Sequence, residues 1–267
     1  MRELLTDYGR IDIIWFDFSY SGRDVTDQLG LEWSAGTGKG KEDWGSEELV
    51  AMVRSLQPGI IMDDRLEVGG DVVTPEEYQP REGMQRDGSP VVWEACQTMN
   101  GSWGYYRDNY NWRPASMLLR MLIDAVSKGG NMLLNVGPTA RGEFPIQAVE
   151  RLEAIGEWMR LHGRSIYGCG VSEYTAPTDC RLTQKGKRLY LHVFDWPYRH
   201  IHLPGMADVV DYAQLLNDGS EIKMIVSDPH QSAQNTTMGG ASGLLTLEIP
   251  VQKPDVMVPV IELFLKD

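Results

Sequence analysis

Residues 1 to about 168 alternate short apolar runs with stretches whose apolar residues repeat at helical spacing. The apolar runs predict buried strands, which we expect at residues 12–18, 60–64, 91–95 and 132–136. Strands that alternate with helices usually pair in parallel. The pattern therefore predicts a parallel sheet with helices on its faces.

Three helices are expected between and after these runs. The stretch SEELVAMVRSLQP places apolar residues on one face, with Ser46 as the predicted N-cap and Pro58 as the stop. A second helix is expected from about residue 114 to 127 and a third over Ile146–His162. Glycine or proline follows each of them, as is common at helix ends.

The pattern changes after SIYGCG at residues 165–170. From there to the C-terminus, short stretches of alternating polar and apolar residues are separated by Gly, Pro, Asn and Asp. This arrangement is typical of antiparallel strands joined by tight turns, and it predicts an antiparallel sheet or sandwich. We therefore expect two domains, residues 1–170 and residues 171–267.

Composition and charge narrow the classes of ligand. The formal net charge is −13 over 267 residues, which disfavours nucleic-acid binding because that needs clustered Lys and Arg. A neutral sugar meets no such repulsion, and eight Trp residues offer faces that suit sugar rings, although core packing accounts for most of them. No apolar stretch of 18 or more residues occurs, so no membrane-spanning helix is expected.

Neither a metal nor a cofactor is expected. The three cysteines, Cys96, Cys169 and Cys180, form no CxxC pair, and the five histidines lie outside the ends of the predicted parallel strands. The glycine-rich stretch SAGTGKGKED at residues 34–43 neither follows a strand nor ends in Gly-Lys-Ser/Thr, so it is not a phosphate-binding loop. A serine hydrolase is poorly supported because no GxSxG sequence occurs.

Polar side chains gather at the C-terminal ends of all four predicted parallel strands. They are Asp17, then Asp63, Asp64 and Arg65, then Glu94 and Cys96, and finally Asn135. In a parallel β/α barrel these strand ends surround the active site. Four such ends together favour a catalytic site over solvated strand ends, and a pair of carboxylates is what cleavage of a glycosidic bond requires.

Six segments resemble glycoside hydrolase family 29, the retaining α-L-fucosidases, in the order in which that family has them. They are YGRIDIIWFDFSY, LQPGIIMDDRL, GGDVVTPEEYQP, VVWEACQTMNGSWGYY, SKGGNMLLNVGPTARGEFP and RLEAIGEWMRLHGRSIYG. The resemblance runs over roughly residues 2 to 170, and KGKRLYLHVFDWP is similar to the start of the family's C-terminal β-sandwich. Together these segments are far more specific than any one of them.

The resemblance implies roles for individual residues. It makes Asp17 the nucleophile and Trp15 a residue that lines the fucose pocket. It makes Arg65 a ligand for the sugar hydroxyls, because the DDRL segment is similar to the family's Asn/Asp-Asp-Arg. It also makes Trp103, in GSWGYY, an aromatic wall beside the methyl group of the sugar.

The acid/base residue is less certain from the resemblance, because the family carries it on a variable loop. Glu76 in TPEEYQP lies at the corresponding place, and Glu94 in VVWEAC is its rival. Glu76 follows a proline in a predicted loop, where an acid/base can reach both leaving group and water. Glu94 lies in a predicted strand, which suits a carboxylate that fixes neighbouring groups. Glu77 is a weaker third candidate.

The chain also departs from the family, because the strands that open the family's barrel have no counterpart here. The resemblance therefore implies an N-terminally truncated enzyme of α/β class. The expected fold is the C-terminal half of a (β/α)8-like barrel followed by an antiparallel β-sandwich. A half barrel exposes a sheet edge, so we expect either a homo-oligomer or another chain that completes the barrel.

Two functions of different class remain open. The first is an α-L-fucosidase that acts on a fucosylated glycan or glycoside. The second is an inactive fucose-binding or carbohydrate-binding module, or an interaction module, derived from such an enzyme. The compartment depends on what precedes residue 1: cytoplasmic without an upstream signal peptide, and secreted, periplasmic or lysosomal with one.

Overall fold

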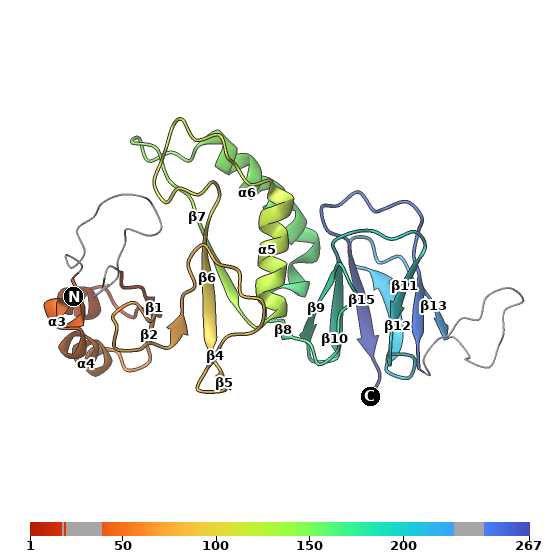
Figure 1. The fold of residues 1–267 in the computed structure, drawn as a ribbon, viewed down its shortest axis with the longest axis horizontal. Coiled ribbons are helices and arrows are strands. Elements are labelled where there is room, and N and C mark those ends of the chain that lie inside the picture. The colour runs from red at the N-terminus through yellow and green to blue at the C-terminus, as the bar shows by residue number, and fades with distance from the viewer. Residues whose placement is uncertain (18, 20–38, 227–242) are drawn as a thin grey trace, which may run out of the picture. The chain divides into compact units, whose positions relative to one another are not determined.

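Figure 1 shows the computed structural model, which describes residues 1–17, 19, 39–226 and 243–267. Phe18 of the first predicted strand and residues 34–38 of the glycine-rich stretch lie outside the described residues. The chain forms two compact units, of which the first comprises Met1–Tyr78 and Gly83–Ala95 and the second Gln79–Glu82 and Cys96–Asp267. The domain boundary expected near residue 171 stays a prediction.

The first unit consists of short helices and two-residue strands. Its elements are α1 (Arg2–Asp7), β1 (Ile13–Ile14), α3 (Lys41–Trp44), α4 (Ser46–Leu56), β2 (Ile61–Met62), β3 (Val72–Val73), β4 (Gln85–Arg86) and β5 (Ser89–Pro90). β1 and β2 pair in parallel, β3 pairs in parallel with the start of the next strand, β6 (Val92–Thr98), and β4 and β5 form a hairpin. The parallel pairing and its alternation with α4 agree with the sequence pattern.

The lengths predicted for the first two strands, residues 12–18 and 60–64, are wrong. The ladder between β1 and β2 ends at Ile14 and Met62. Beyond it, a side chain takes over from the backbone, since the Asp63 carboxylate accepts the N–H of Phe16 at 3.0 Å. The Asp71 carboxylate likewise accepts the N–H of Met62 at 2.8 Å. Apolar runs do not reveal such substitutions, which explains the overestimated strand lengths.

The expectation that the first strand is buried also fails. Ile13 of β1 is 60% exposed, and among the described residues only β2 pairs with this strand. Ile61 of β2 is exposed as well. Residues 11–16 are therefore exposed or only partly buried.

An apolar cluster joins α1, α4 and the two strands of the first unit. Its buried members are Leu5, Val53, Ile60 and Met62. The side chain of Gln57 ties the chain together beside this cluster. It accepts the N–H of Ile11 at 2.8 Å and donates to the carbonyl of Leu5 at 2.9 Å. These bonds fix the segment that leads into β1.

The predicted N-cap of the first long helix is also corrected by the structure. Ser46 is the first residue of α4, and Gly45 is its N-cap. Gly45 has a φ of 57°, a left-handed conformation that glycine adopts without steric cost, and it also ends α3. The junction between two helices needs this conformation, so the cap falls on the glycine rather than on the serine.

The second unit contains the longer elements. β6 continues into it, and α5 (Ala115–Ser127), β7 (Asn131–Asn135), α6 (Ile146–His162), the 3-10 helix η1 (Gly163–Ser165) and β8 (Gly170–Val171) follow. The sheet order is β3-β6-β7. The two helices agree with the residues that the sequence predicts. β6 extends beyond residue 95, the predicted end of this strand. Its last residues, 96–98, are buried.

Antiparallel strands make up the rest of the second unit, as the alternating pattern indicates. They are β9 (Cys180–Lys185), β10 (Arg188–Val193), β11 (His200–Leu203), β12 (Val210–Leu215), β13 (Lys223–Val226), β14 (Leu245–Glu248) and β15 (Val260–Leu265). One sheet has the order β12-β15-β10-β9-β8 and the other β11-β14-β13. Leucines and isoleucines from both sheets share one buried cluster, so the two sheets enclose a common core.

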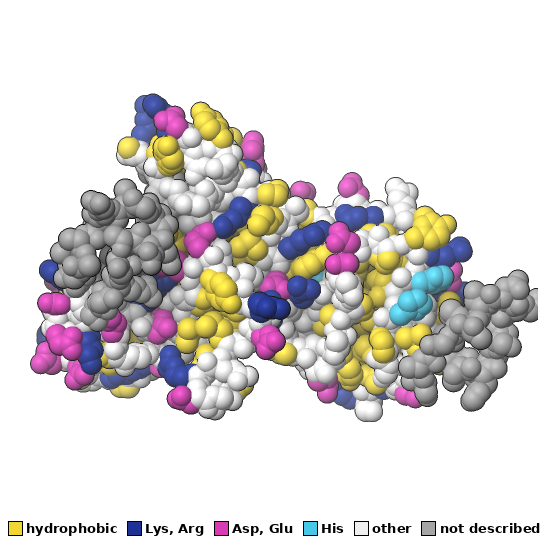
Figure 2. Space-filling view, in the orientation of Figure 1, with side chains coloured by type: hydrophobic (Ala, Val, Ile, Leu, Met, Phe, Trp, Pro, Cys, Tyr) yellow, Lys and Arg dark blue, Asp and Glu magenta, His cyan; other side chains and the backbone are white. Residues whose placement is uncertain are grey.

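None of the described helices has the length and apolarity needed to cross a bilayer. On the face shown in Figure 2, basic side chains are interspersed with acidic ones.

Two histidines are fully buried where α6 packs on the antiparallel strands. His162 stacks on Trp158, with ring centroids 4.7 Å apart, and its Nδ1 lies 3.0 Å from the carbonyl of Trp158. The hydroxyl of Thr183 donates to the carbonyl of Ser165, so it accepts from Nε2 of His192 at 3.0 Å. Burial, together with the charge of His162, lowers the pKa of His192 to about 3.

This burial predicts a loss of stability in acid. Between pH 6.5 and about 3 the unfolded chain binds a proton at His192 that the folded chain does not bind. The free energy of unfolding should therefore fall as the pH falls through this window, by up to about 1.4 kcal/mol per pH unit for this group. Urea unfolding at pH 7 and pH 5 measures the effect.

His192→Gln should flatten this pH dependence, whatever it does to stability at pH 7. His200→Gln is the matched control, because His200 is exposed on β11. Equal losses between pH 7 and pH 5 in the wild type and in His192→Gln would contradict the assignment.

Candidate active site

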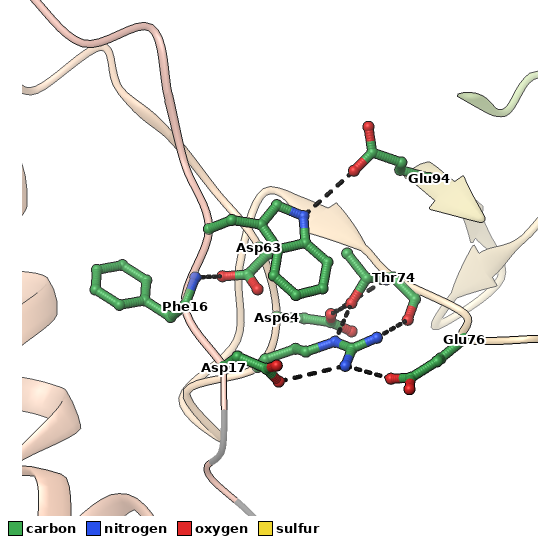
Figure 3. A network of polar contacts seen from close by, with 9 residues as sticks. Phe16, Asp17, Asp63, Asp64, Thr74, Glu76 and Glu94 are labelled. Carbon is green, nitrogen blue, oxygen red and sulfur yellow. Dashed lines mark hydrogen bonds and ion pairs between the residues drawn. The ribbon is translucent and has the colours of Figure 1, made fainter. Parts of the chain in front are cut away.

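Four segments of the first unit bring polar side chains together, as Figure 3 shows. Asp17 follows β1, the run Asp63–Arg65 follows β2, Glu76 lies beyond β3, and Glu94 lies in β6. β1 pairs in parallel with β2, and β3 with β6, while a parallel bridge between Asp63 and Val72 connects the two pairs. Parallel strands deliver their C-terminal ends to the same edge of a sheet, which is why these side chains meet.

The guanidinium of Arg65 lies between two carboxylates. Its Nη1 is 2.5 Å from Oε2 of Glu76 and 3.4 Å from Oδ1 of Asp17. The Arg65 side chain is only 11% exposed, whereas those of Asp17 and Glu76 are 39% and 40% exposed. Because both oxygens contact one nitrogen, their separation cannot exceed the sum of the two distances. The two carboxylates are therefore close neighbours that both face solvent.

Thr74 fixes the orientation of that guanidinium. Arg65 donates from Nε to the hydroxyl of Thr74 at 2.9 Å and from Nη2 to its carbonyl at 3.1 Å. The Thr74 hydroxyl donates in turn to Oδ1 of Asp64 at 2.8 Å, and the same oxygen accepts the N–H of Thr74 at 3.2 Å. Two of the three guanidinium nitrogens are thus committed to Thr74, and Nη1 faces the carboxylates.

Trp15 covers one side of Arg65. The guanidinium carbon lies 4.6 Å from the centre of the Trp15 ring, which is a cation–π contact. The indole N–H of Trp15 donates to Oε1 of Glu94 at 3.2 Å. Glu94 therefore orients the aromatic ring, whereas Glu76 contacts the cation that also contacts Asp17. The two acid/base candidates therefore differ in the groups that they contact.

Asp63 is the buried acid of the group, with 1% of its surface exposed. Burial raises the pKa of its carboxyl to about 6, and the negative charges of Asp64 and Asp17 act in the same direction. The hydrogen bond from Phe16 and the charge of Arg65 oppose the shift. Asp63 thus exchanges a proton close to neutral pH.

Two further residues are singled out in the sequence, Glu77 and Trp103. Glu77 is exposed and has a φ of 48°. Trp103 belongs to the second unit, where its carbonyl accepts the side-chain N–H of Asn135 at 2.7 Å. Gly137 packs against this loop so closely that a Cβ there would lie 2.5 Å from the carbonyl carbon of Gly104. The Trp103 loop is therefore held by two contacts within its own unit.

The sequence did not reveal the parts played by Asp63, Asp64 and Thr74. The acidic doublet directly before Arg65 was visible at a strand end, but nothing in it distinguished a buried acid from a solvated one. Thr74 carried no signal at all. Within the described ranges, no group of three or more His, Cys, Asp or Glu residues is arranged to hold a metal ion.

Comparison with known proteins points to a single family. A family model described as alpha-L-fucosidase matches residues 1–164. The plasma alpha-L-fucosidase of Rattus norvegicus is 31% identical over an alignment of 183 residues, and the match covers 62% of this chain and 39% of that protein. The alpha-L-fucosidase of Dictyostelium discoideum is 32% identical over an alignment of 181 residues, and the match covers 64% of this chain and 37% of that protein. This chain thus spans about two fifths of these curated relatives.

Solved structures of alpha-L-fucosidases are also similar to this chain. Alpha-L-fucosidase isoenzyme 1 from Paenibacillus thiaminolyticus is 40% identical with a TM-score of 0.83, and the match covers 100% of this chain and 60% of that one. A GH29 alpha-L-fucosidase from Bacteroides thetaiotaomicron, solved as a covalent intermediate trapped with 2-fluoro-fucosyl fluoride, is 25% identical with a TM-score of 0.75. That match covers 100% of this chain and 59% of the other.

Proposed function

The chain belongs to the alpha-L-fucosidase family, and we propose that it hydrolyses terminal α-L-fucosyl linkages of glycoconjugates by a retaining double displacement. The observation that carries this proposal is the contact of Arg65 Nη1 with both Asp17 and Glu76. A retaining glycosidase needs two carboxyl groups roughly 5–5.5 Å apart. The shared contact with one nitrogen limits the separation of these two oxygens to the sum of the two contact distances, which supports such a spacing over one near 9 Å.

In the first step Asp17 attacks the anomeric carbon of the fucosyl group. The bond from that carbon to the leaving oxygen breaks, and Glu76 gives its proton to this oxygen. An ester between Asp17 and the sugar results, and the aglycone departs as an alcohol. Asp17 suits the role of nucleophile because its side chain is partly exposed at the end of a parallel strand.

In the second step the ionised Glu76 takes a proton from water. The water oxygen attacks the anomeric carbon from the side that the aglycone left, and the ester bond to Asp17 breaks. Fucose leaves with its original configuration, and both carboxyl groups return to their starting states. The position of Glu76 beyond β3, with 40% of its side chain exposed, supports a residue that meets both aglycone and water.

Arg65 and Trp15 would form the floor of the sugar site. Without a sugar, Nη1 of Arg65 pairs with Glu76. A hydroxyl of the bound sugar that accepts from Nη1 would compete with this ion pair, and the released Glu76 would take up a proton from solvent and carry it to the leaving oxygen. Thr74 would keep the guanidinium in place during this exchange. Glu94, bonded to the indole of Trp15, would act by orienting the ring.

Trp103 is proposed as the aromatic wall beside the methyl group of fucose. Its side chain is 40% exposed, and the contacts of Asn135 and Gly137 hold its loop. An apolar ring that remains accessible to solvent suits the C5 methyl group, which is the apolar corner of this sugar.

We further propose that residues 1–170 form the second half of a (β/α)8 barrel whose remaining strands are supplied beside β1. The exposed edge at Ile13 supports this proposal, because within the described residues β1 pairs only with β2, and an open parallel edge with an apolar side chain is an association site. Either a second copy of this chain or another polypeptide would cover it. If nothing completes the barrel at this edge, part of the sugar pocket is missing, and the second candidate function is a module that binds fucose without turning it over.

Turnover of an aryl α-L-fucoside by the 267-residue chain tests the proposed function. Asp17→Ala should lower kcat by on the order of 10⁴-fold, because the variant cannot form the ester. Proton NMR of the first-formed fucose should show the α configuration. Asp12→Ala is the matched control, since Asp12 is an exposed acid of the same segment that pairs with Arg10. Binding of fucose without turnover would favour the second candidate function instead.

Chemical rescue distinguishes Glu76 from Glu94. With an activated aryl leaving group the first step needs no acid, so loss of the acid/base residue slows mainly the attack of water on the ester. Azide or formate needs no base and should restore turnover in Glu76→Ala, with a fucosyl azide of retained configuration as product. Glu94→Ala should respond far less, because Glu94 acts on Trp15. Stronger rescue of Glu94→Ala would reverse the assignment.

A further inference from the structure

One carboxyl group at the site has no part in the double displacement. Asp63 lies directly after β2 and is 1% exposed, whereas the side chains of Asp17 and Glu76 are about two fifths exposed. It is too deeply buried to touch a sugar. A carboxyl group is costly to bury, so its presence at this position requires a physical reason.

The hydrogen bond that Asp63 accepts shows which part of the site it affects. Oδ1 of Asp63 accepts the backbone N–H of Phe16 at 3.0 Å, and Phe16 directly precedes Asp17. The backbone ladder between β1 and β2 ends at Ile14. This side-chain bond is therefore what continues the link between the two segments up to the proposed nucleophile.

The second carboxyl oxygen of Asp63 indicates that this group carries a proton. Oδ2 of Asp63 is buried and has no hydrogen-bond partner among the described residues. An ionised oxygen without a partner is costlier to bury than a neutral hydroxyl. Three charged groups act on this carboxyl: Asp64 and Asp17 oppose its ionisation and Arg65 favours it. Loss of the proton therefore places a second negative charge next to Asp17.

We propose that Asp63 is a positioning residue for Asp17, which it holds through the N–H of Phe16. Loss of the proton from its buried carboxyl group adds a negative charge next to the nucleophile. This inference rests on the proposed function of Asp17. Below about pH 6 Asp63 is neutral, and above that pH it is ionised. Repulsion between Asp63 and Asp17 is relieved when Asp17 forms the ester, so ionisation of Asp63 should speed the first step.

Carbon-13 NMR of aspartate carboxyl carbons tests the coupling without any need for turnover. In the wild-type chain one carboxyl carbon should titrate near pH 6 and disappear in Asp63→Asn. The Asp17 carbon, assigned with Asp17→Asn, should shift over the same pH range. That second shift should be absent in Asp63→Asn. An Asp17 signal that does not respond near pH 6 in the wild type would overturn the proposal.

Asp71 supplies a matched control. It also accepts a strand N–H, that of Met62 at 2.8 Å, but its partner is one strand further from Asp17. Asp71→Asn should leave the pH response of the Asp17 carbon as in the wild type. Loss of that response in Asp71→Asn would show a general effect of strand loosening and would contradict a specific role for Asp63.

Kinetics with an aryl α-L-fucoside supply the second readout. Asp63→Ala should lower kcat by about 10²-fold with a much smaller change in KM, because misplacement of the nucleophile affects the chemical step. Asp63→Asn should recover part of kcat, since its amide oxygen can still accept from Phe16, but kcat/KM should lose its inflection near pH 6. Equal kcat in Asp63→Ala and the wild type would refute the positioning role.

The two proposals fail in different ways. A wild-type chain that does not turn over the fucoside, yet shows the Asp17 response near pH 6, would remove the proposed hydrolysis and keep the coupling between Asp63 and Asp17. A wild-type chain that hydrolyses the fucoside without that response would keep the function and remove the role of Asp63.

Discussion

Two carboxylates that lie close enough to share a reaction repel each other, and this repulsion has to be balanced within the fold. In this chain the balance comes from Arg65, whose Nη1 contacts both Asp17 and Glu76. The guanidinium can do so because Thr74 binds its other two nitrogens and Trp15 covers its face. A lysine at this position has neither the planar fork nor the stacking face, so it could not make the same set of contacts.

The same residues that form the site also hold the sheet together. The parallel strands of the first unit are two residues long, and side-chain carboxylates continue their pairing. Asp63 accepts from Phe16, Asp64 from Thr74 and Asp71 from Met62. The geometry of the proposed site and the local fold are therefore linked, because a change at one of these acids should alter both strand pairing and the placement of Asp17 or Arg65.

Much of this arrangement could be predicted from the sequence. Each failure involves a contact or a conformation that no local sequence pattern shows. Helical spacing indicated α5 and α6, and the strand-end acids and their resemblance to the fucosidases singled out Asp17, Arg65 and Glu76. Strand lengths failed because apolar runs do not show where a carboxylate replaces a backbone acceptor. The N-cap failed because Gly45 needs a left-handed conformation that only the geometry of the helix junction imposes. The bond between Glu94 and Trp15 joins residues 79 positions apart, which no local pattern encodes.

Covalent trapping tests the central claim most directly. With 2-fluoro-fucosyl fluoride, the reagent used for the trapped Bacteroides thetaiotaomicron enzyme, the fluorine at C2 slows both steps while the fluoride leaving group lets the first one proceed. Mass spectrometry of the digested chain should find one 2-fluoro-fucosyl group on the peptide that contains Asp17, and none in Asp17→Asn. A label on another carboxylate, or an unlabelled chain that still hydrolyses fucosides, would contradict the account.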